Sequence, residues 1–269
     1  MSSLELPKPL GLDALHPPQR SPWRHWLGQA TWPFTLLMVL ATLLSVLPSL
    51  RLLWEALAGW RLGPDAPLLR AAADPMTWYA LINTLNMGVW GTLVAVALGA
   101  LFALAVVLTD MRRKSLWVFA FMLPMMIPPQ VTALAWLQLL GPSSTLLQSL
   151  DLAPALGSPQ PLYSPAGIAL LLGVQHAPLV FLALRASLLA LPADLCEAAR
   201  LSGAGPWRVL WQVVLPLARP GLVAGAAMAF VSALGNFGIP AMLGIPVGYY
   251  TLPTLIYQKM ASFGPGMLQ

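Results

Sequence analysis

The chain has 269 residues, of which 58% are hydrophobic and only 9% are charged. Ordinary soluble domains carry roughly 25% charged residues, so these proportions exclude an ordinary soluble domain and make lipid the expected solvent for most of the chain. The basic residues behind the net charge of +5 lie in short segments between apolar runs. This placement favours a role in setting the orientation of the chain in a membrane over a role in nucleic-acid binding. The single cysteine, Cys196, excludes an intrachain disulfide and a cysteine-based metal cluster.

Apolar runs of membrane-spanning length recur along the chain. Residues 1–28 are polar and dotted with proline, which predicts a disordered tail without a cleaved signal peptide. Residues 29–54 contain TWPFTLLMVLATLLSVLPSL, about the length that a helix needs to cross a bilayer, and are predicted to form the first transmembrane helix. Similar runs predict further spans at residues 75–109, 116–140, 166–191 and 216–234. The expected fold class is therefore an all-α, polytopic membrane helix bundle of about five spans.

The basic residues are spread unevenly over the predicted loops. Arg112, Arg113 and Lys114 lie between the second and third spans, whereas residues 141–165, between the third and fourth, contain neither lysine nor arginine. Because positively charged loops stay on the cytoplasmic side, the first of these loops is predicted to be inside and the second outside. The N-terminus and the segment after the fourth span are then cytoplasmic.

The last part of the chain, residues 235–269, is rich in glycine and proline. Leu252, Leu255, Ile256 and Met260 recur there at helical spacing, which predicts an amphipathic helix along the outer face. No sixth apolar run follows. We therefore expect residues 77–269 to form a transmembrane domain that lacks its last helix.

Between the fourth and fifth spans the sequence becomes charged and is interrupted by glycine, EAARLSGAGPWRVLWQVVLPL. The preceding PADLC and the first residues of this stretch predict a short helix that ends before Gly203. Pro206 is expected to begin a second short helix in which Trp207, Leu210 and Val214 share one face, and the fifth span follows it. A cytoplasmic helix, turn and helix with an apolar stripe is suited to docking into a groove of a soluble partner.

The spacing within this stretch carries a resemblance to a known family. Glu-Ala-Ala is followed by three residues, a glycine, nine residues, a β-branched residue, one residue and Leu-Pro. This pattern resembles the EAA loop of binding-protein-dependent ABC importer permeases, with Val213 where that family usually has isoleucine. The similarity covers residues 77–257, because NTLNMGVWGTLVAVALGALFALAVVLTDM is also similar to the opening helix of the family's transport domain.

The resemblance implies a permease subunit of an importer in the bacterial inner membrane, which is a transporter component and not an enzyme. Residues 193–216 would form the coupling loop that contacts a separate ATPase. The residues implied in coupling are Glu197, Ala198, Ala199, Gly203, Leu215 and Pro216. The implied partners are an ATP-binding cassette ATPase dimer, a periplasmic or extracellular substrate-binding protein, a second permease half and the lipid bilayer, with no nucleic acid and no cofactor. No glycine-rich phosphate loop is present, so ATP hydrolysis is expected on another chain.

A second resemblance concerns the substrate. Residues 236–260, NFGIPAMLGIPVGYYTLPTLIYQKM, look like the N-terminal half of fused iron(III)-type permeases, whose relatives handle phosphonates, polyamines or sulfate. We therefore expect iron(III) or a related small ion or complex as the substrate. No resident metal site is expected, because the intramembrane His176 has no second ligand at metal-binding spacing.

Polar residues within the predicted spans are candidates for the substrate path, because exposure to lipid would cost them hydrogen bonds. These candidates are Asn83, Asn86, Gln130 and Asn236. Hydrogen bonding between helices is the alternative explanation for them. The main alternative function is a secondary transporter driven by an ion gradient, which would need coupling carboxylates in the membrane, and no acidic residue lies in a predicted span.

Overall fold

The computed structural model describes residues 31–58, 66–155 and 157–262, and the regular secondary structure within these ranges is helical, without strands. This confirms the all-α fold class. The helices in chain order are α2 (Thr31–Ala58), α3 (Pro67–Ala73), α4 (Pro75–Leu108), α5 (Lys114–Met126), α6 (Pro129–Leu139), α7 (Thr145–Ser149), α8 (Pro165–Leu189), α9 (Ala193–Leu201), α10 (Pro206–Val209), the π-helix η3 (Leu210–Val214), α11 (Leu215–Leu234), α12 (Gly238–Leu243), the 3₁₀-helix η4 (Ile245–Val247) and α13 (Leu252–Ser262). The tail predicted for residues 1–28 lies outside the described residues.

Four helical segments of the described chain are long and apolar enough to cross a membrane: Trp32–Glu55, Pro75–Leu108, Pro165–Leu189 and Pro206–Leu234. The first lies in α2, which belongs to the unit formed by residues up to Ala71. The other three belong to the unit that begins at Ala72, called the permease unit below. The spans predicted from the sequence are confirmed at these four places.

The third predicted span differs from the single helix expected over residues 116–140. It consists of α5 and α6, whose axes meet at 105°. Ile127 and Pro128 between them have extended backbone, with ψ of 135° and 138°. Because a residue that precedes proline disfavours the helical conformation and proline has no N–H to donate, Pro128 and Pro129 in succession end α5 and begin α6.

The segment before the fifth span also differs from the prediction. A helix begins at Pro206 as expected, but it continues through η3 into α11 and forms one apolar segment of 29 residues. The N–H of Leu215 donates to the carbonyl of Leu210, five residues back, in the wider turn of a π-helix. This wider turn directly precedes Pro216, which has no N–H for an ordinary helical hydrogen bond. The second short helix and the fifth span are therefore continuous.

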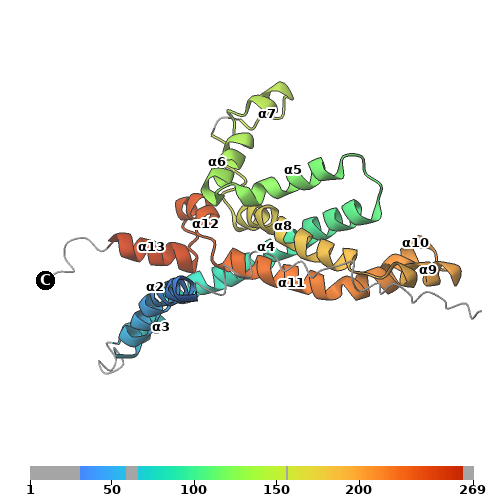
Figure 1. Cartoon of the computed structure of the whole chain (residues 1–269). Coiled ribbons are helices and arrows are strands. Elements are labelled where there is room, and N and C mark those ends of the chain that lie inside the picture. Colours follow the sequence, from blue (N-terminus) through green and yellow to red (C-terminus); the bar gives the residue numbers. More distant parts are fainter. Residues whose placement is uncertain (1–30, 59–65, 156, 263–269) are drawn as a thin grey trace, which may run out of the picture. The chain divides into compact units, whose positions relative to one another are not determined.

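Helices α4, α8 and α11 pack along one another and form the core of the permease unit (Figure 1). Glycines permit their close approach. A Cβ built on Gly99 of α4 would lie 2.6 Å from the carbonyl oxygen of Ala177 in α8. A Cβ on Gly225 of α11 would lie 2.8 Å from the Cα of Val180. Small residues at such crossings allow the van der Waals packing that holds helices together in lipid.

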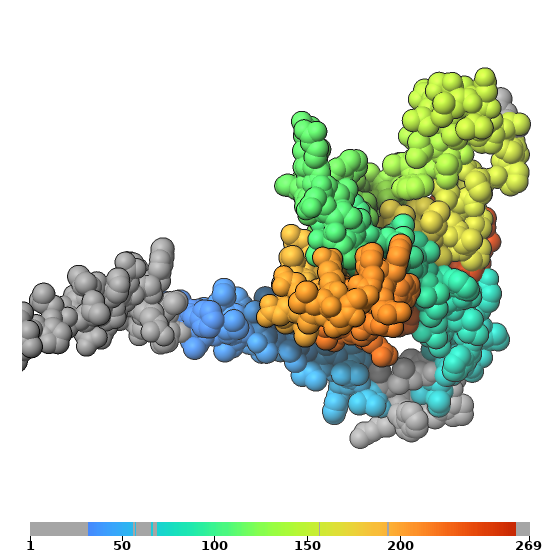
Figure 2. All heavy atoms as spheres, turned by 90° about the vertical axis from the view of Figure 1, so that its right-hand side faces the viewer, coloured from blue at the N-terminus to red at the C-terminus, as the bar shows by residue number. Residues whose placement is uncertain are grey.

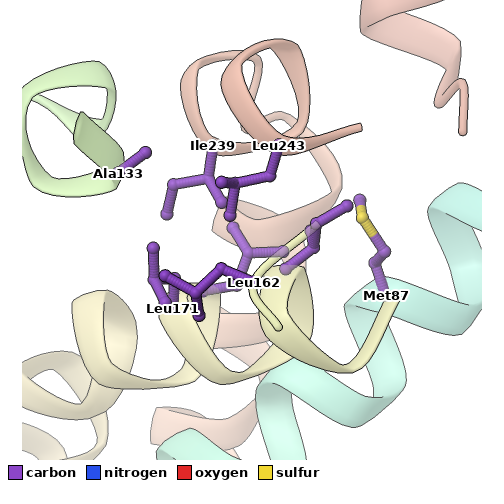
Figure 3. Close-up of a cluster of buried hydrophobic side chains, with 8 residues drawn as sticks. Met87, Ala133, Leu162, Leu171, Ile239 and Leu243 are labelled. Atoms are coloured by element: carbon purple, nitrogen blue, oxygen red, sulfur yellow. The ribbon is translucent and has the colours of Figure 1, made fainter. Parts of the chain in front are cut away.

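After α11 the chain turns back onto the bundle. Ile239 and Leu243 of α12 belong to a buried cluster with Ala133 of α6, Leu171 of α8 and Met87 of α4 (Figure 3). This packing places the start of α12 against the start of α6. The end of α11 is thereby held next to the break between α5 and α6.

The sequence predicts a helix near the end of the chain, and the structure has one there, α13. Leu255 on one side is buried, whereas Ile256 and Met260 are exposed. Lys259 donates a hydrogen bond to the carboxylate of Asp74, which precedes α4. This ion pair joins α13 to the start of the second predicted span.

Candidate functional site

The EAA segment, defined here as residues 193–216, begins with α9 and then reverses direction through a glycine turn. The N–H of Gly203 donates to the carbonyl of Arg200 at 2.9 Å, and the N–H of Ala204 donates to that of Ala199 at 3.1 Å. Gly203 has φ of +82°. This pair of hydrogen bonds around a left-handed residue is a Schellman motif, which satisfies carbonyls at the end of a helix. The predicted turn at Gly203 is therefore confirmed.

The six residues assigned to coupling differ in their exposure. Glu197, Ala198, Gly203 and Pro216 are exposed, whereas Ala199 and Leu215 are half-buried. Ala199 packs against the cluster that joins the EAA segment to the ends of α4 and α8. Within the part of the chain that the structure describes, the Glu197 carboxylate has no hydrogen bond or ion pair. Some residues of the motif therefore pack against the core of the permease unit, whereas others are exposed.

Several large apolar side chains of the EAA segment are exposed. Leu201 is 90% exposed, Trp207 73% and Trp211 66%. Trp207 and Trp211 are four residues apart, and both side chains are exposed. Val209 and Val214 are buried. The sequence placed Val214 on the same stripe as Trp207, and this was wrong, because the π-helix changes the register after Trp207. In the view of Figure 2 this segment, in orange, lies at the front of the permease unit.

Two of the four candidate path residues lie near the start of α4. Asn83 is buried, and its Nδ2 donates to the carbonyl of Tyr250 at 2.9 Å. The hydroxyl of Tyr249 donates to the carbonyl of Asn83 at 3.4 Å. Burial, with a smaller contribution from Tyr79, raises the pKa of Tyr249, so this phenol stays a donor at neutral pH. Asn86 lines a mainly apolar cavity of about 500 Å³ between α4 and α8.

The other two candidates flank the start of α12. The side chain of Gln130 lies against Gly238, where a Cβ would be 2.9 Å from the Gln130 Cδ. Asn236 follows the end of α11, and its Oδ1 accepts the N–H of Ile239 at 3.2 Å. Residues more than a hundred positions apart in the sequence are thus brought to one place.

A cavity of about 410 Å³ lies at this place and is called the break cavity here. It is lined by Met125, Met126, Ile127, Pro128, Pro129, Gln175, His176, Leu179, Ser232 and Asn236. Of these, the sequence proposed Asn236 for the path, and it excluded His176 as a metal ligand because no second ligand lies at metal-binding spacing. It missed Gln175 and Ser232, although the pair Gln-His inside an apolar span was a visible signal. Among the described residues, no three His, Cys, Asp or Glu side chains gather at a possible metal site.

Long apolar helices, two of them separated by breaks that meet at a cavity, define a multi-pass membrane protein. Residues 95–267 match the family described as binding-protein-dependent transport system inner membrane component. The chain belongs to this family. It is therefore a component of an inner-membrane transporter and not an enzyme, and the family implies that it works with an ATPase and a substrate-binding protein.

Individual relatives agree with this assignment. The chain is 32% identical over 211 residues to the inner membrane ABC transporter permease protein YdcU of Escherichia coli (strain K12), covering 73% of this chain and 66%, just under two thirds, of that relative. It is 30% identical over 194 residues to the molybdenum transport system permease protein ModB of the same strain, covering 71% of this chain and 82% of ModB. It is 30% identical over 231 residues to the putative 2-aminoethylphosphonate transport system permease protein PhnU of Salmonella typhimurium, covering 85% and 80%. The predicted resemblance to ABC importer permeases is confirmed.

Proposed function

We propose that the chain forms half of the substrate path of an ATP-driven importer and couples to a separate ATPase through the EAA segment. The observation that carries this proposal is the presence of both exposed and packed residues in the segment. Glu197, Leu201, Trp207 and Trp211 are exposed. Other residues of the segment pack on buried residues of α4 and α8. Apolar anchors of this kind fit a groove of a partner protein, and the packed residues transmit a displacement to the bundle.

The continuous helix from Pro206 to Leu234 supports the same proposal. A force applied at Trp207 and Trp211 acts on a helix whose far part, around Gly225, is packed closely against α8. A rigid helix carries a rotation along its length, as rigid-body switching between two states requires. In the proposed orientation the N-terminus and the EAA segment are cytoplasmic. The proposed partners are an ATPase dimer, an external substrate-binding protein and a second permease half.

For the substrate we propose a small solute that carries an oxyanion group. Two of the relatives named above are permeases for molybdenum and for 2-aminoethylphosphonate, by their names. None of the three names mentions iron, so iron(III) stays a prediction from sequence resemblance alone. Asn236 and the break cavity are proposed as part of the path. Asn83 has a sufficient structural role in its hydrogen bond to Tyr250.

Cysteine crosslinking in native membranes tests the coupling role. Ala198 is exposed and Ala199 is half-buried on the chain's own core, so position 198 is the better site for the probe. In a Cys196→Ala background, Ala198→Cys is expected to capture the ATPase of the complete transporter, with a yield that changes when ATP is added. Ser158→Cys, exposed in the connection between α7 and α8, is the control that should capture no ATPase.

Two further results bear on the proposal. Glu197→Ala should reduce ATP-dependent uptake while the amount of protein in the membrane stays unchanged. Absence of an ATPase adduct in a well-expressed, complete transporter, together with uptake that follows an ion gradient, would favour the secondary-transporter alternative.

Uptake of labelled solutes tests the substrate. Cells that express the complete transporter are supplied with molybdate, 2-aminoethylphosphonate or iron(III), with the Glu197→Ala transporter as the defective control. We expect uptake of an oxyanion-bearing solute above this control. Uptake of iron(III) alone would support the sequence resemblance and overturn the proposed substrate class.

A further inference from the structure

Residues 109–114, called the cationic turn here, join α4 to α5 and carry three consecutive cations. Arg112 and Arg113 are exposed, and Lys114 is half-buried. Within the part of the chain that the structure describes, none of these three side chains makes an ion pair or a hydrogen bond. With Asp110 as its one carboxylate, the cationic turn has a net charge of +2. Its cations are therefore available to an anion from outside the chain.

A surface cavity of about 690 Å³ adjoins the cationic turn and is called the α5 cavity here. It is lined by Arg113, Ser115, Leu116 and Phe119. The first two residues are polar, and the other two are large apolar residues that are 59% and 57% exposed. The lining thus changes along the chain from a cation and a hydroxyl to apolar groups. A phospholipid has the same order of groups, because its phosphate is followed by acyl chains.

The depth of the cavity in the membrane agrees with this order. The cationic turn joins the end of the span α4 to the start of the broken span formed by α5 and α6. It therefore lies at the level of the lipid headgroups, where basic residues attract anionic lipids. Phe119 is six residues beyond Arg113, about 9 Å along the helix axis, which is the side of the acyl chains.

The backbone of Arg113 has a conformation that favours glycine. Its φ is 58° and its ψ is 43°, in the left-handed region. A residue with a Cβ is less stable there than glycine, so the turn by itself would form more readily without this side chain. A role of the guanidinium outside the turn accounts for an arginine at this position.

The cationic turn lies at the same end of the permease unit as α9 and α10 (Figure 1). Met111 of the turn packs against the buried cluster that contains Val209 and Val214 of the EAA segment. An acidic surface of the ATPase is therefore a second possible source of negative charge. The exposed apolar side chains of Leu116 and Phe119, within a span, favour a lipid over this soluble partner.

We infer that the α5 cavity binds an anionic phospholipid, with the phosphate at Arg113 and Ser115 and an acyl chain along Leu116 and Phe119. A guanidinium forms charge-assisted hydrogen bonds with a phosphate. The choline of phosphatidylcholine cancels the charge of its phosphate, so an anionic headgroup is attracted more strongly to the cationic turn. The site goes beyond the proposed import function and needs only a membrane. Its assignment to the inner leaflet rests on the proposed orientation.

Photocrosslinking from within the cavity tests the inference. The complete transporter, with Phe119→p-benzoylphenylalanine, is placed in nanodiscs of equal parts phosphatidylglycerol and phosphatidylcholine with the same acyl chains. Mass spectrometry then measures the ratio of the two lipid adducts. We expect phosphatidylglycerol to be preferred at least about fivefold, the effect of one cation near a membrane surface. The same probe at Leu101, a 67% exposed residue of α4, should show nearly equal adducts.

Substitutions at Arg113 separate the charge from the turn. Arg113→Gly should remove most of the preference without lowering the unfolding temperature, because glycine suits the left-handed conformation. Arg113→Lys should keep most of the preference. Arg112→Ala removes the same charge from an exposed residue outside the cavity lining and should have a smaller effect. If Arg113→Gly does not assemble, Arg113→Asn provides the same test, because asparagine also tolerates this conformation.

A preference at Phe119 no greater than at Leu101, or one unchanged by Arg113→Gly, would overturn the inference. Equal losses in Arg112→Ala and Arg113→Gly would replace the site with a diffuse attraction to the whole turn. Loss of the lipid adducts in excess inorganic phosphate would mean a site for free phosphate, and an ATPase adduct in place of lipid would mean a protein contact. ATPase capture at Ala198→Cys tests the import function separately, since lipid preference without capture keeps this site and rejects the coupling.

Discussion

Glycine has different physical roles in the helix bundle and in the EAA segment. In the bundle, a Cβ on Gly99 would lie 2.6 Å from a backbone oxygen of Ala177, so the absence of a side chain provides space. At Gly203 a Cβ would meet no atom within 4 Å, but φ is +82°, so glycine provides a backbone angle. The bundle is therefore fixed by contact between helices, and the turn at Gly203 is fixed by local hydrogen bonds. A closely packed bundle that moves as one body, with a turn in the EAA segment that projects from it, suits the proposed transmission of movement from a partner.

The largest effect is expected from a side chain placed between helices α4 and α8. Gly99→Ala should lower the free energy of unfolding by about 1–3 kcal/mol, because the added methyl group meets backbone atoms that cannot rotate away. Thermal unfolding of the purified protein in detergent measures this. Gly235→Ala is the control, since its nearest atoms would be 3.9 Å away, and it should be nearly neutral. Equal losses of unfolding free energy in Gly99→Ala and Gly235→Ala would show that the lack of space around Gly99 is not the cause of the effect.

A smaller and more local effect is expected in the EAA segment. Gly203→Ala should destabilise the turn by about 1–2 kcal/mol, because a left-handed conformation is unfavourable for a residue with a Cβ. Hydrogen exchange at the Ala204 amide should become roughly 5–30 times faster, with little change in the unfolding of the bundle. Gly205, in the same loop, has φ of −68°, which a residue with a Cβ also adopts. Gly205→Ala should therefore leave the exchange of the Ala204 amide unchanged. A loss of bundle stability equal to that of Gly99→Ala would contradict the division between the two regions.

The exposed tryptophans should affect binding and not folding. Trp207→Ala removes a 73% exposed side chain, so the unfolding temperature should stay nearly the same. Affinity for the ATPase should fall by about tenfold, because aromatic anchors account for much of the binding energy of such interfaces. Surface plasmon resonance with the partner ATPase measures this change. Trp117→Ala, at an exposed tryptophan of α5, is the matched control, and an equal loss of affinity there would contradict a specific contact.

The sequence predicts the helices and the motif well because both depend on local pattern. It does not predict the continuity of helices, since counting apolar residues cannot detect the change in backbone at Ile127 or the π-helix before Pro216. It also cannot determine which motif residue faces outward, because the burial of Ala199 depends on distant parts of α4 and α8. The break cavity has the same origin: Gln175 meets the carbonyl of Ile127, 48 positions away, through the fold alone.

The contact between α13 and α4 should contribute least, because it is held by exposed charges. The hydrogen bond from Lys259 is the main cause that lowers the pKa of Asp74, and the N–H of Met76 adds to it. A carboxylate whose pKa is lowered by folding stabilises the protein above its unfolded pKa and loses this contribution as the pH falls through its folded pKa. Asp74→Asn keeps an acceptor for the Met76 N–H and removes the charge.

Asp74→Asn should therefore lower the unfolding temperature slightly at neutral pH, on the order of 1 °C, as expected for an exposed ion pair. The difference from the unsubstituted protein should disappear below the pKa of Asp74, which lies under its ordinary value of 3.8, and should shrink in high salt. Unfolding temperatures measured across that pH range provide the test. A large difference in unfolding temperature that persists in acid would mean that Asp74 acts through its hydrogen bond at the start of α4 and not through its charge. The contact between α13 and α4 would then depend on local packing and hydrogen bonding, as the bundle does.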